Sequence, residues 1–219
     1  MKNVMTKRFA MNTVAAVLLT SSLAACIPLI VGGAVVGGTL VASDRRTSGA
    51  QLEDEGIELR STSRIRSNVG DRVHVNVSSY NRQVLLTGEV PTAHDKLLVE
   101  QIVSRVENVS SVANELAVLS SSSLTQRSSD VLVTGRVKAM LVDAKDLFAN
   151  SFRVVTERGT TYLMGRVTQR EADRGTAVAR GTPGVQKVVR IFEIISEEEL
   201  ARQLPAPAKP PAEKPAAAN

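Results

Sequence analysis

The chain contains an internal repeat, which restricts the possible folds more than any other feature of its 219 residues. Residues 73–90 align with residues 150–167 at a constant offset of 77, and the alignment places Gly88 on Gly165. In each copy, alternating apolar positions, a polar turn and a second alternating run predict a β-hairpin. The sequence therefore predicts two structural units of the same kind.

A helix and a further strand are expected after each hairpin, and another helix before it. A Val-x-x-Val motif at 109–112 recurs at 185–188 with an offset of 76, so the second copy lacks one residue between its glycine and this motif. The expected helices are 52–68, 95–106, 130–150 and 171–180, and the expected last strands are 114–119 and 190–195. In the first copy, the residues expected to face the core from the helices are Leu59, Ile65, Leu98, Ile102 and Val106. Each unit then has the order αββαβ.

This order, with a glycine after the second strand and Val-x-x-Val at the last turn, resembles the BON domain. The resemblance implies an α+β fold of two tandem BON domains, residues 51–119 and 129–196, each with two helices packed on a three-stranded mixed sheet. Gly88 and Gly165 are hallmark positions of that family. We expect a structural role for them, because a strand-end glycine lets a helix pack closely or supports a bulge; a functional role is the alternative. The serine-rich stretch 120–128 is expected to be a flexible linker.

The residues before the first unit have the order of a secretory signal followed by a lipobox. A basic start and a short apolar run precede Leu23-Ala24-Ala25-Cys26, which holds the only cysteine of the chain. The pattern resembles a bacterial lipoprotein precursor. This implies that residues 1–25 are a signal peptide that is removed, and that Cys26 carries a diacylglycerol and an N-acyl chain as a permanent anchor. Ile27, rather than an aspartate, follows the cysteine, which points to the outer membrane, periplasmic leaflet.

The segments that flank the two units are expected to have no fold of their own. Residues 26–50 are expected to be a lipidated, flexible tether. Its uncharged part, 27–42, contains four glycines and is too short for the roughly 20 apolar residues of a membrane span. Residues 197–219 are rich in proline and alanine and are expected to be disordered.

Composition argues against nucleic-acid binding and against catalysis. Removal of the signal peptide lowers the formal net charge from +5 to +2, and the chain has no tryptophan and no dense cluster of lysine and arginine, so no nucleic-acid partner is expected. His74 and His94 are the only histidines, and no HExxH, GxSxG or phosphate-loop motif occurs. We expect a solvated or capping role for both histidines, no metal site, no cofactor besides the covalent lipid, and no enzymatic activity.

Charge distinguishes the two units. Residues 51–119 carry 7 Lys and Arg against 10 Asp and Glu, a net charge of −3, whereas residues 129–195 carry 11 against 7, a net charge of +4. An anionic lipid surface would repel the first unit and attract the second, by about 1 kcal/mol for each cation near it.

The helix expected at 130–150 carries the candidate lipid-binding residues. Its core stripe is predicted to contain Val133, Val137, Met140, Leu141, Ala144, Leu147 and Phe148. Leu132 and Val142 fall outside this stripe, near Arg136, Lys138 and Lys145, and apolar residues beside cations suit insertion at a headgroup boundary. The family resemblance also implies that the second domain binds anionic phospholipid. Two alternatives stay open: ordinary exposed aliphatic side chains, or a contact with the first domain.

Together these features predict a non-enzymatic, lipid-anchored protein that binds anionic phospholipid and helps maintain outer-membrane integrity. The alternative is a protein-interaction module that docks an envelope assembly complex, such as the outer-membrane protein assembly machinery, while lipid only localises it.

Overall fold

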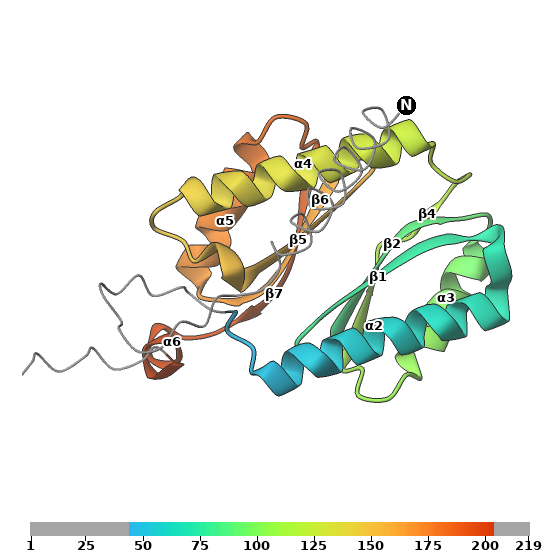
Figure 1. Ribbon diagram of the computed structural model, residues 1–219, viewed down its shortest axis with the longest axis horizontal. Coiled ribbons are helices and arrows are strands. Elements are labelled where there is room, and N and C mark those ends of the chain that lie inside the picture. The colour runs from blue at the N-terminus through green and yellow to red at the C-terminus, as the bar shows by residue number, and fades with distance from the viewer. Residues whose placement is uncertain (1–43, 204–219) are drawn as a thin grey trace, which may run out of the picture. The chain divides into compact units, whose positions relative to one another are not determined.

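The computed structural model describes residues 44–203. Cys26, the signal peptide, the tether up to residue 43 and the tail from residue 204 lie outside the described residues. Within them the chain forms two α+β domains in succession, each with the predicted order αββαβ and each built on a mixed sheet (Figure 1).

In the first domain, β1 pairs antiparallel with β2, and β2 pairs parallel with both β3 and β4. Its elements are α2 (Ser48–Val69), the 3-10 turn η2 (Gly70–Arg72), β1 (His74–Tyr80), β2 (Gln83–Val90), α3 (Ala93–Ser104), β3 (Ser111–Asn114) and β4 (Ala117–Val118). The last strand, predicted as one piece over 114–119, is thus split. At the break the N–H of Leu116 donates to Asn114 Oδ1 at 3.3 Å instead of to the neighbouring strand, and the Leu116 side chain is buried in the core.

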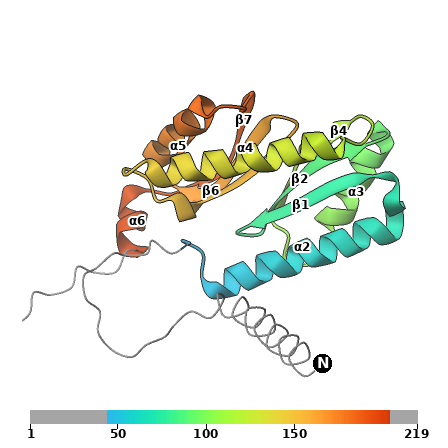
Figure 2. The same cartoon turned by 45° about the horizontal axis from the view of Figure 1, so that its top comes forward.

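The second domain has a three-stranded sheet in which β5 pairs antiparallel with β6 and β6 pairs parallel with β7. Its elements are α4 (Leu124–Asp143), η3 (Ala149–Ser151), β5 (Phe152–Glu157), β6 (Thr160–Val167), α5 (Gln169–Gly181), β7 (Lys187–Ile194) and α6 (Glu197–Gln203). Helices α4 and α5 lie side by side against one face of this sheet (Figure 2).

The residue missing from the second copy is located in the loop before the second helix of each domain. In the first domain Pro91 separates Val90, the end of β2, from Thr92, the N-cap of α3. In the second domain Val167 ends β6 and the next residue, Thr168, already caps α5. A single deletion in this loop therefore explains the change of offset from 77 to 76.

Three expected unstructured segments are partly ordered. The linker expected over 120–128 is wrong from Leu124 onward, because Ser123 caps α4 by accepting a hydrogen bond from the N–H of Gln126 at 3.2 Å. The tail expected to be disordered from residue 197 begins with α6, whose first turn holds three glutamates, a favourable charge at a helix N-terminus, and which buries Leu200. The expected tether also ends earlier than residue 50, because α2 begins at Ser48.

On α2 the core residues recur every four positions. Ile57, Ser61, Ile65 and Val69 are buried, whereas Leu59 is 72% exposed. Leu59 lies two residues from Ile57, which is about 200° around a helix. The expectation that Leu59 faces the core is therefore wrong, and a buried serine occupies the stripe instead.

The core stripe of α3 lies one residue further along than expected. Val99 and Val103 are fully buried, while Leu98 and Ile102 are only partly buried at the edge of the same core. Val106 is buried as predicted, just beyond the end of the helix.

Helix α4 is shorter than the expected 130–150 at its C-terminal end. It ends at Asp143, because Ala144 has an extended backbone with ψ of 92°. Met140 and Phe148 are exposed rather than in the core, and the guanidinium carbon of Arg45 lies 5.6 Å from the centre of the Phe148 ring. The other residues of the predicted stripe are buried: Val133, Val137, Leu141, Ala144 and Leu147.

The sheet faces that the helices leave open contribute to a third apolar cluster shared by the two domains. Along β2, Val84 and Leu86 belong to the helix-covered core, while Leu85 between them points to the opposite face. Along β6, Tyr162 and Met164 also point away from the helices. The shared cluster contains Tyr80, Leu85, Tyr162, Met164 and Ile191, with Ala113, Val155 and Val189 packed against it. Each sheet is therefore covered on part of its second face as well.

Candidate functional site

The candidate lipid-binding residues are placed on the outer side of α4 and just after it. Leu132 is 61% exposed and Val142 is 67% exposed, and Arg136, Lys138 and Lys145 are exposed as well. Neither apolar side chain belongs to the cluster that joins the two domains. The alternative that they contact the first domain therefore finds no support.

Sequence reasoning missed two further members of this surface. Leu124 is 79% exposed and Val131 is 70% exposed. At 100° per residue, Leu124, Val131 and Val142 lie within about 20° of one another around the helix. The signal was the spacing of seven between Leu124 and Val131, which was hidden because residue 124 was assigned to the linker. We call Leu124, Val131, Leu132 and Val142 the outer face of α4.

Gly88 and Gly165 occupy equivalent positions on β2 and β6, opposite Val75 and Phe152 of the neighbouring strands. A Cβ on Gly88 would lie 2.1 Å from the carbonyl oxygen of His74, and a Cβ on Gly165 would lie 2.3 Å from that of Ser151. Gly88 also has φ of +112°, a region that favours glycine. Of the two expected causes, close packing of a helix or a bulge, the first is not what excludes a side chain here: the backbone of the adjacent strand does.

A buried aspartate on the first helix of each domain holds the turn of the following hairpin. Asp54 accepts hydrogen bonds from the backbone N–H groups of Asn81 and Arg82, both at 2.8 Å. Asp130 accepts equivalent bonds from Arg158 at 2.9 Å and Gly159 at 3.0 Å. These turns contain residues with positive φ, so the buried carboxylate stabilises a conformation that most residues avoid.

Asp54 has further partners that keep it ionised. Burial by itself raises the pKa of Asp54, but hydrogen bonds from Ser79 Oγ, from the turn and from Arg46 together hold this pKa below its usual value. Arg46 Nη1 lies 2.7 Å from Asp54 Oδ2, and its guanidinium carbon lies 4.2 Å from the centre of the Tyr80 ring.

The residue before Arg46 pairs with the other domain. Arg45 donates two hydrogen bonds of 2.7 Å to the two carboxylate oxygens of Glu171, which is fully buried and forms the capping box of α5 with Thr168. Burial raises the pKa of Glu171, but the bonds from Arg45 and from the Thr168 N–H outweigh it and lower this pKa. Residues 45 and 46 thus connect the start of the described chain to both domains, so the expected flexible tether is wrong for this part.

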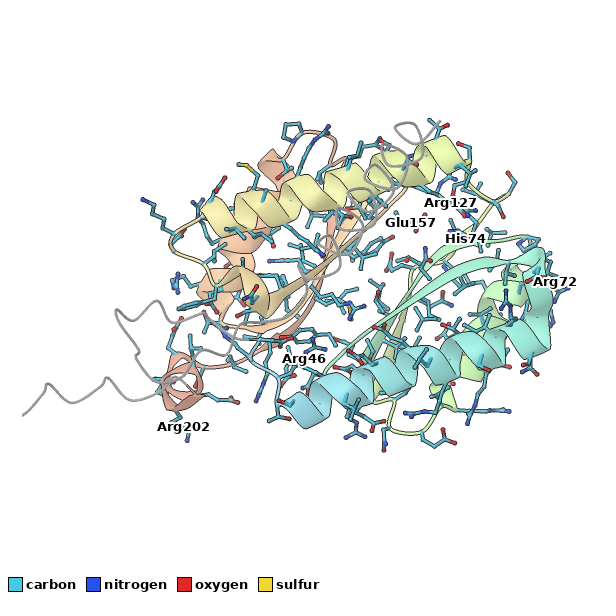
Figure 3. The ribbon with its side chains drawn as sticks, viewed as in Figure 1. Arg46, Arg72, His74, Arg127, Glu157 and Arg202 are labelled. Atoms are coloured by element: carbon cyan, nitrogen blue, oxygen red, sulfur yellow. The ribbon has the colours of Figure 1, made fainter. Side chains whose placement is uncertain are left out.

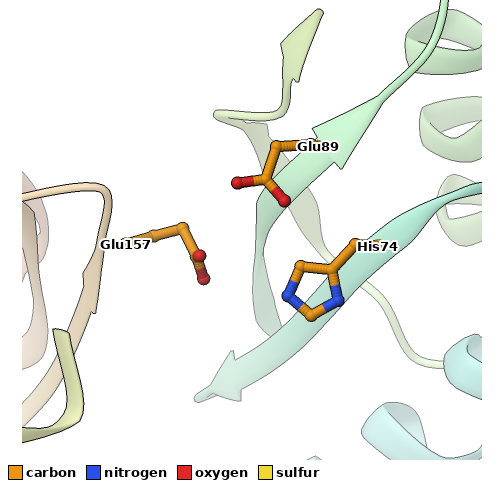
Figure 4. A group of neighbouring side chains, drawn as sticks. All are labelled: His74, Glu89 and Glu157. Carbon is orange, nitrogen blue, oxygen red and sulfur yellow. The ribbon is translucent and has the colours of Figure 1, made fainter. Parts of the chain in front are cut away.

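A third group of polar side chains combines both domains. His74 on β1 is the cross-strand partner of Glu89 on β2, and Glu157 ends β5 (Figures 3 and 4). Both glutamates are buried and His74 is half-buried. Burial, together with the charge of Arg127, lowers the pKa of His74, and burial raises the pKa of Glu157, an effect that the charge of Glu89 increases.

Of the two histidines, His94 has the expected solvated position and His74 does not. His94 is exposed in the first turn of α3, where Thr92 and not His94 provides the cap. His74 is neither capping nor fully solvated.

The family comparison follows the two domains. The model of the BON domain matches residues 53–120 and 129–195. This protein belongs to the BON domain family. We refer to the two matched segments as BON domain 1 and BON domain 2.

Relatives of known name cover most of the chain. "Outer membrane lipoprotein DolP" of Haemophilus influenzae is 35% identical over 179 residues, 80% of this chain and 92% of that protein. The "21 kDa hemolysin" of Actinobacillus pleuropneumoniae is 29% identical over 154 residues, 69% of this chain and 79% of that protein. Among solved structures, the C-terminal domain of CdsD from the type III secretion system of Chlamydia trachomatis aligns over all of its length with 69% of this chain, at 15% identity and a TM-score of 0.27. Over residues 44–203, no helix is both long enough and apolar enough to cross a bilayer.

Proposed function

We propose that this protein is an outer-membrane lipoprotein, anchored through Cys26, that binds anionic phospholipid with the outer face of α4 and thereby helps maintain outer-membrane integrity. The lipobox and the name of the Haemophilus relative support the location. The proposal involves no catalytic step.

The observation that carries the lipid proposal is the combination of apolar exposure and unpaired positive charge on α4. The outer face presents four aliphatic side chains to solvent, and Arg136, Lys138 and Lys145 form no ion pair with any residue in the described part of the chain. Six other arginines of BON domain 2 are each paired with a carboxylate: Arg153, Arg158, Arg166, Arg170, Arg174 and Arg190. The net charge of BON domain 2 therefore overstates how strongly most of its surface attracts anionic lipid. At α4 the cations are unpaired, so their attraction is not reduced in this way.

Because the protein is anchored to the membrane, a surface with low intrinsic affinity for lipid is sufficient for binding. A tethered domain meets the membrane at a high effective concentration, so a few cations and two or more inserted aliphatic side chains suffice for stable contact. Salt should weaken this contact, because exposed charges are screened beyond about 8 Å at physiological ionic strength.

The test is co-sedimentation of residues 44–219, without the lipid anchor, with vesicles of phosphatidylglycerol and phosphatidylcholine or of phosphatidylcholine alone. We expect binding only to the anionic vesicles, and we expect Leu132→Glu to weaken it about tenfold or more, because it removes an inserted side chain and adds repulsion. Leu59→Glu is the matched control: it makes the same change at a similarly exposed position on the first helix of BON domain 1.

Circular dichroism establishes that both variants are folded. Equal loss in both variants, or no loss with Leu132→Glu, would contradict the assignment of the lipid surface to α4.

One observation favours the alternative, a protein-interaction module for an envelope assembly complex. Leu52 and Leu59 are both strongly exposed on α2 and lie seven residues apart, on one side of the helix. If Leu59→Glu impairs envelope integrity in cells while vesicle binding is unchanged, the interaction module is the better description of BON domain 1.

A further inference from the structure

His74, Glu89 and Glu157 form a group whose ligand atoms all lie within 4.8 Å of one another. Two of the residues come from adjacent strands of BON domain 1 and the third comes from the end of β5 in BON domain 2 (Figure 4). We propose that these three side chains bind one divalent transition-metal ion of the Zn²⁺ class, which then links the two BON domains.

The acceptor atoms of these three side chains receive few hydrogen bonds from the described residues. Glu157 accepts one bond, from Asn76 Nδ2 to its Oε2 at 2.9 Å, and its Oε1 has no donor among the described residues. From the described part of the chain, Glu89 accepts two hydrogen bonds, from Ser122 Oγ and from Arg158 Nη1, both at 3.3 Å. The His74 ring forms no hydrogen bond with any described residue. Buried carboxylates are normally fully hydrogen-bonded or bound to a cation. Among the described residues, the ion pair of this group is the 3.3 Å contact of Arg158 with Glu89, and Glu157 has none.

The donor set and its spacing fit Zn²⁺. One imidazole nitrogen and two carboxylate oxygens are ligands that Zn²⁺ accepts at about 2.0–2.2 Å, which places them roughly 3.4 Å apart in a tetrahedron. Binding requires side-chain rotations that bring the three atoms from separations of up to 4.8 Å to this spacing. Calcium and magnesium prefer a larger shell of oxygen atoms, so the imidazole favours a transition metal.

An ion and its fourth ligand have access to the group. His74 and Glu157 border a cavity of about 610 Å³ that also reaches Arg127 and Asp130. A water molecule from this cavity completes the tetrahedron. Asp130 is already committed to the turn of the hairpin.

The neighbouring positive charges do not block the site. Arg127 donates to Ser122 Oγ at 3.1 Å. Arg158 is partly exposed, with 41% of its side chain accessible, so it can turn to solvent when an ion takes its place beside Glu89.

The chain provides a clean test, because it has only two histidines. The mature lipidated protein in detergent micelles is stripped with EDTA and titrated with Zn²⁺ by calorimetry at neutral pH. We expect one ion per chain, a higher melting temperature with Zn²⁺, and reversal of that increase by EDTA.

Two variants and one control decide the assignment. His74→Ala and Glu157→Gln should each weaken Zn²⁺ binding about a hundredfold or more, since even changes beyond the direct ligands typically weaken metal sites ten- to a hundredfold. His94→Ala should bind like the wild type. Glu157→Gln keeps the size of the side chain and the bond from Asn76, so it decides the question if His74→Ala fails to fold.

Three results would overturn the proposal. These are no Zn²⁺ binding by the wild type at millimolar concentration, equal binding by wild type and both ligand variants, and competition by Ca²⁺ or Mg²⁺ as strong as by Co²⁺. The last result would indicate a site made by carboxylates alone. A tetrahedral Co²⁺ spectrum that His74→Ala abolishes would support the imidazole as a direct ligand.

Discussion

At the scale of single residues, three buried acidic side chains stabilise parts of the backbone on which the fold depends. Asp54, Asp130 and Glu171 are almost inaccessible, and each satisfies backbone N–H groups that the fold would otherwise leave without an acceptor. A charged side chain in such a position is stable only because every bond is present at once.

Asp54→Asn should lower the free energy of unfolding at neutral pH by about 3 kcal/mol, because it leaves the Arg46 guanidinium and the hairpin turn without their charged partner. The pKa of Asp54 is lower in the folded protein than its usual value near 3.9, so its contribution is present above that pH and is lost as pH falls through the folded pKa. Urea unfolding should therefore show a large difference between wild type and variant at pH about 7, and a smaller one near pH 3.

The control is Asp143→Asn, an exposed aspartate at the end of α4. It should change stability by less than about 0.5 kcal/mol. A difference for Asp54→Asn that does not depend on pH would show that its carboxylate charge is unimportant.

At the scale of elements, the two domains pack a strand against a helix with side chains of different size at equivalent positions. Phe152 of β5 occupies the position of Val75 of β1, and the ring of Phe152 lies where a Cβ on Gly175 of α5 would be, at 2.8 Å. Counted from the N-caps, Gly175 corresponds to Val99 of α3. A large strand residue facing a helix glycine in BON domain 2 thus corresponds to two valines in BON domain 1.

Substitution of the strand glycines tests which glycines the stability of the fold requires. Gly88→Ala and Gly165→Ala should each destabilise the protein by about 1–3 kcal/mol, because the new Cβ would overlap a carbonyl oxygen of the adjacent strand. Gly135→Ala lies in α4 with nothing within 4 Å of the new Cβ, and it should stabilise the protein by about 0.5–1 kcal/mol.

Thermal melts of the three variants make the comparison, with vesicle binding measured in parallel. Unchanged melting of Gly88→Ala or Gly165→Ala together with lost lipid binding would make these positions functional rather than structural.

At the scale of the whole described molecule, residues 45 and 46 connect the N-terminal segment to both domains. The bidentate pair of Arg45 with Glu171 belongs to BON domain 2, and the pair of Arg46 with Asp54 belongs to BON domain 1. The shared apolar cluster and the ion pair of Arg153 with Glu58 at 2.8 Å add further contacts between the domains. The two domains are therefore expected to unfold as one cooperative unit.

Arg45→Ala should lower the free energy of unfolding by about 3 kcal/mol, because Glu171 remains buried without its guanidinium partner. Arg45→Lys should recover only part of this loss, since an ammonium group cannot form the two parallel bonds. Urea unfolding of residues 44–219 measures both. Arg180→Ala, at an exposed arginine of α5 without an ion pair in the described range, is the control and should be nearly neutral. Equal effects of Arg45→Ala and Arg180→Ala would show that the contact of Arg45 contributes little.

The sequence by itself determined the local and periodic features of this protein. Alternation within residues 73–90 and 150–167, the equivalence of Gly88 and Gly165, and a four-residue spacing such as Val133, Val137 and Leu141 depend only on neighbours along the chain. They predicted the two αββαβ units and the exposure of Leu132 and Val142, and the BON family match confirms the fold. The lipid-binding role of the outer face of α4 stays a prediction.

Only the tertiary structure decided which groups meet across long separations. Arg45 reaches Glu171 126 positions away, and Glu157 comes within range of His74 from the other domain. Such partners have no fixed spacing in the chain, so neither the repeat nor the helical period contains them. The burial of Asp54 and the contact of Arg45 likewise follow from a hairpin turn and a helix cap that are formed by residues distant in the sequence.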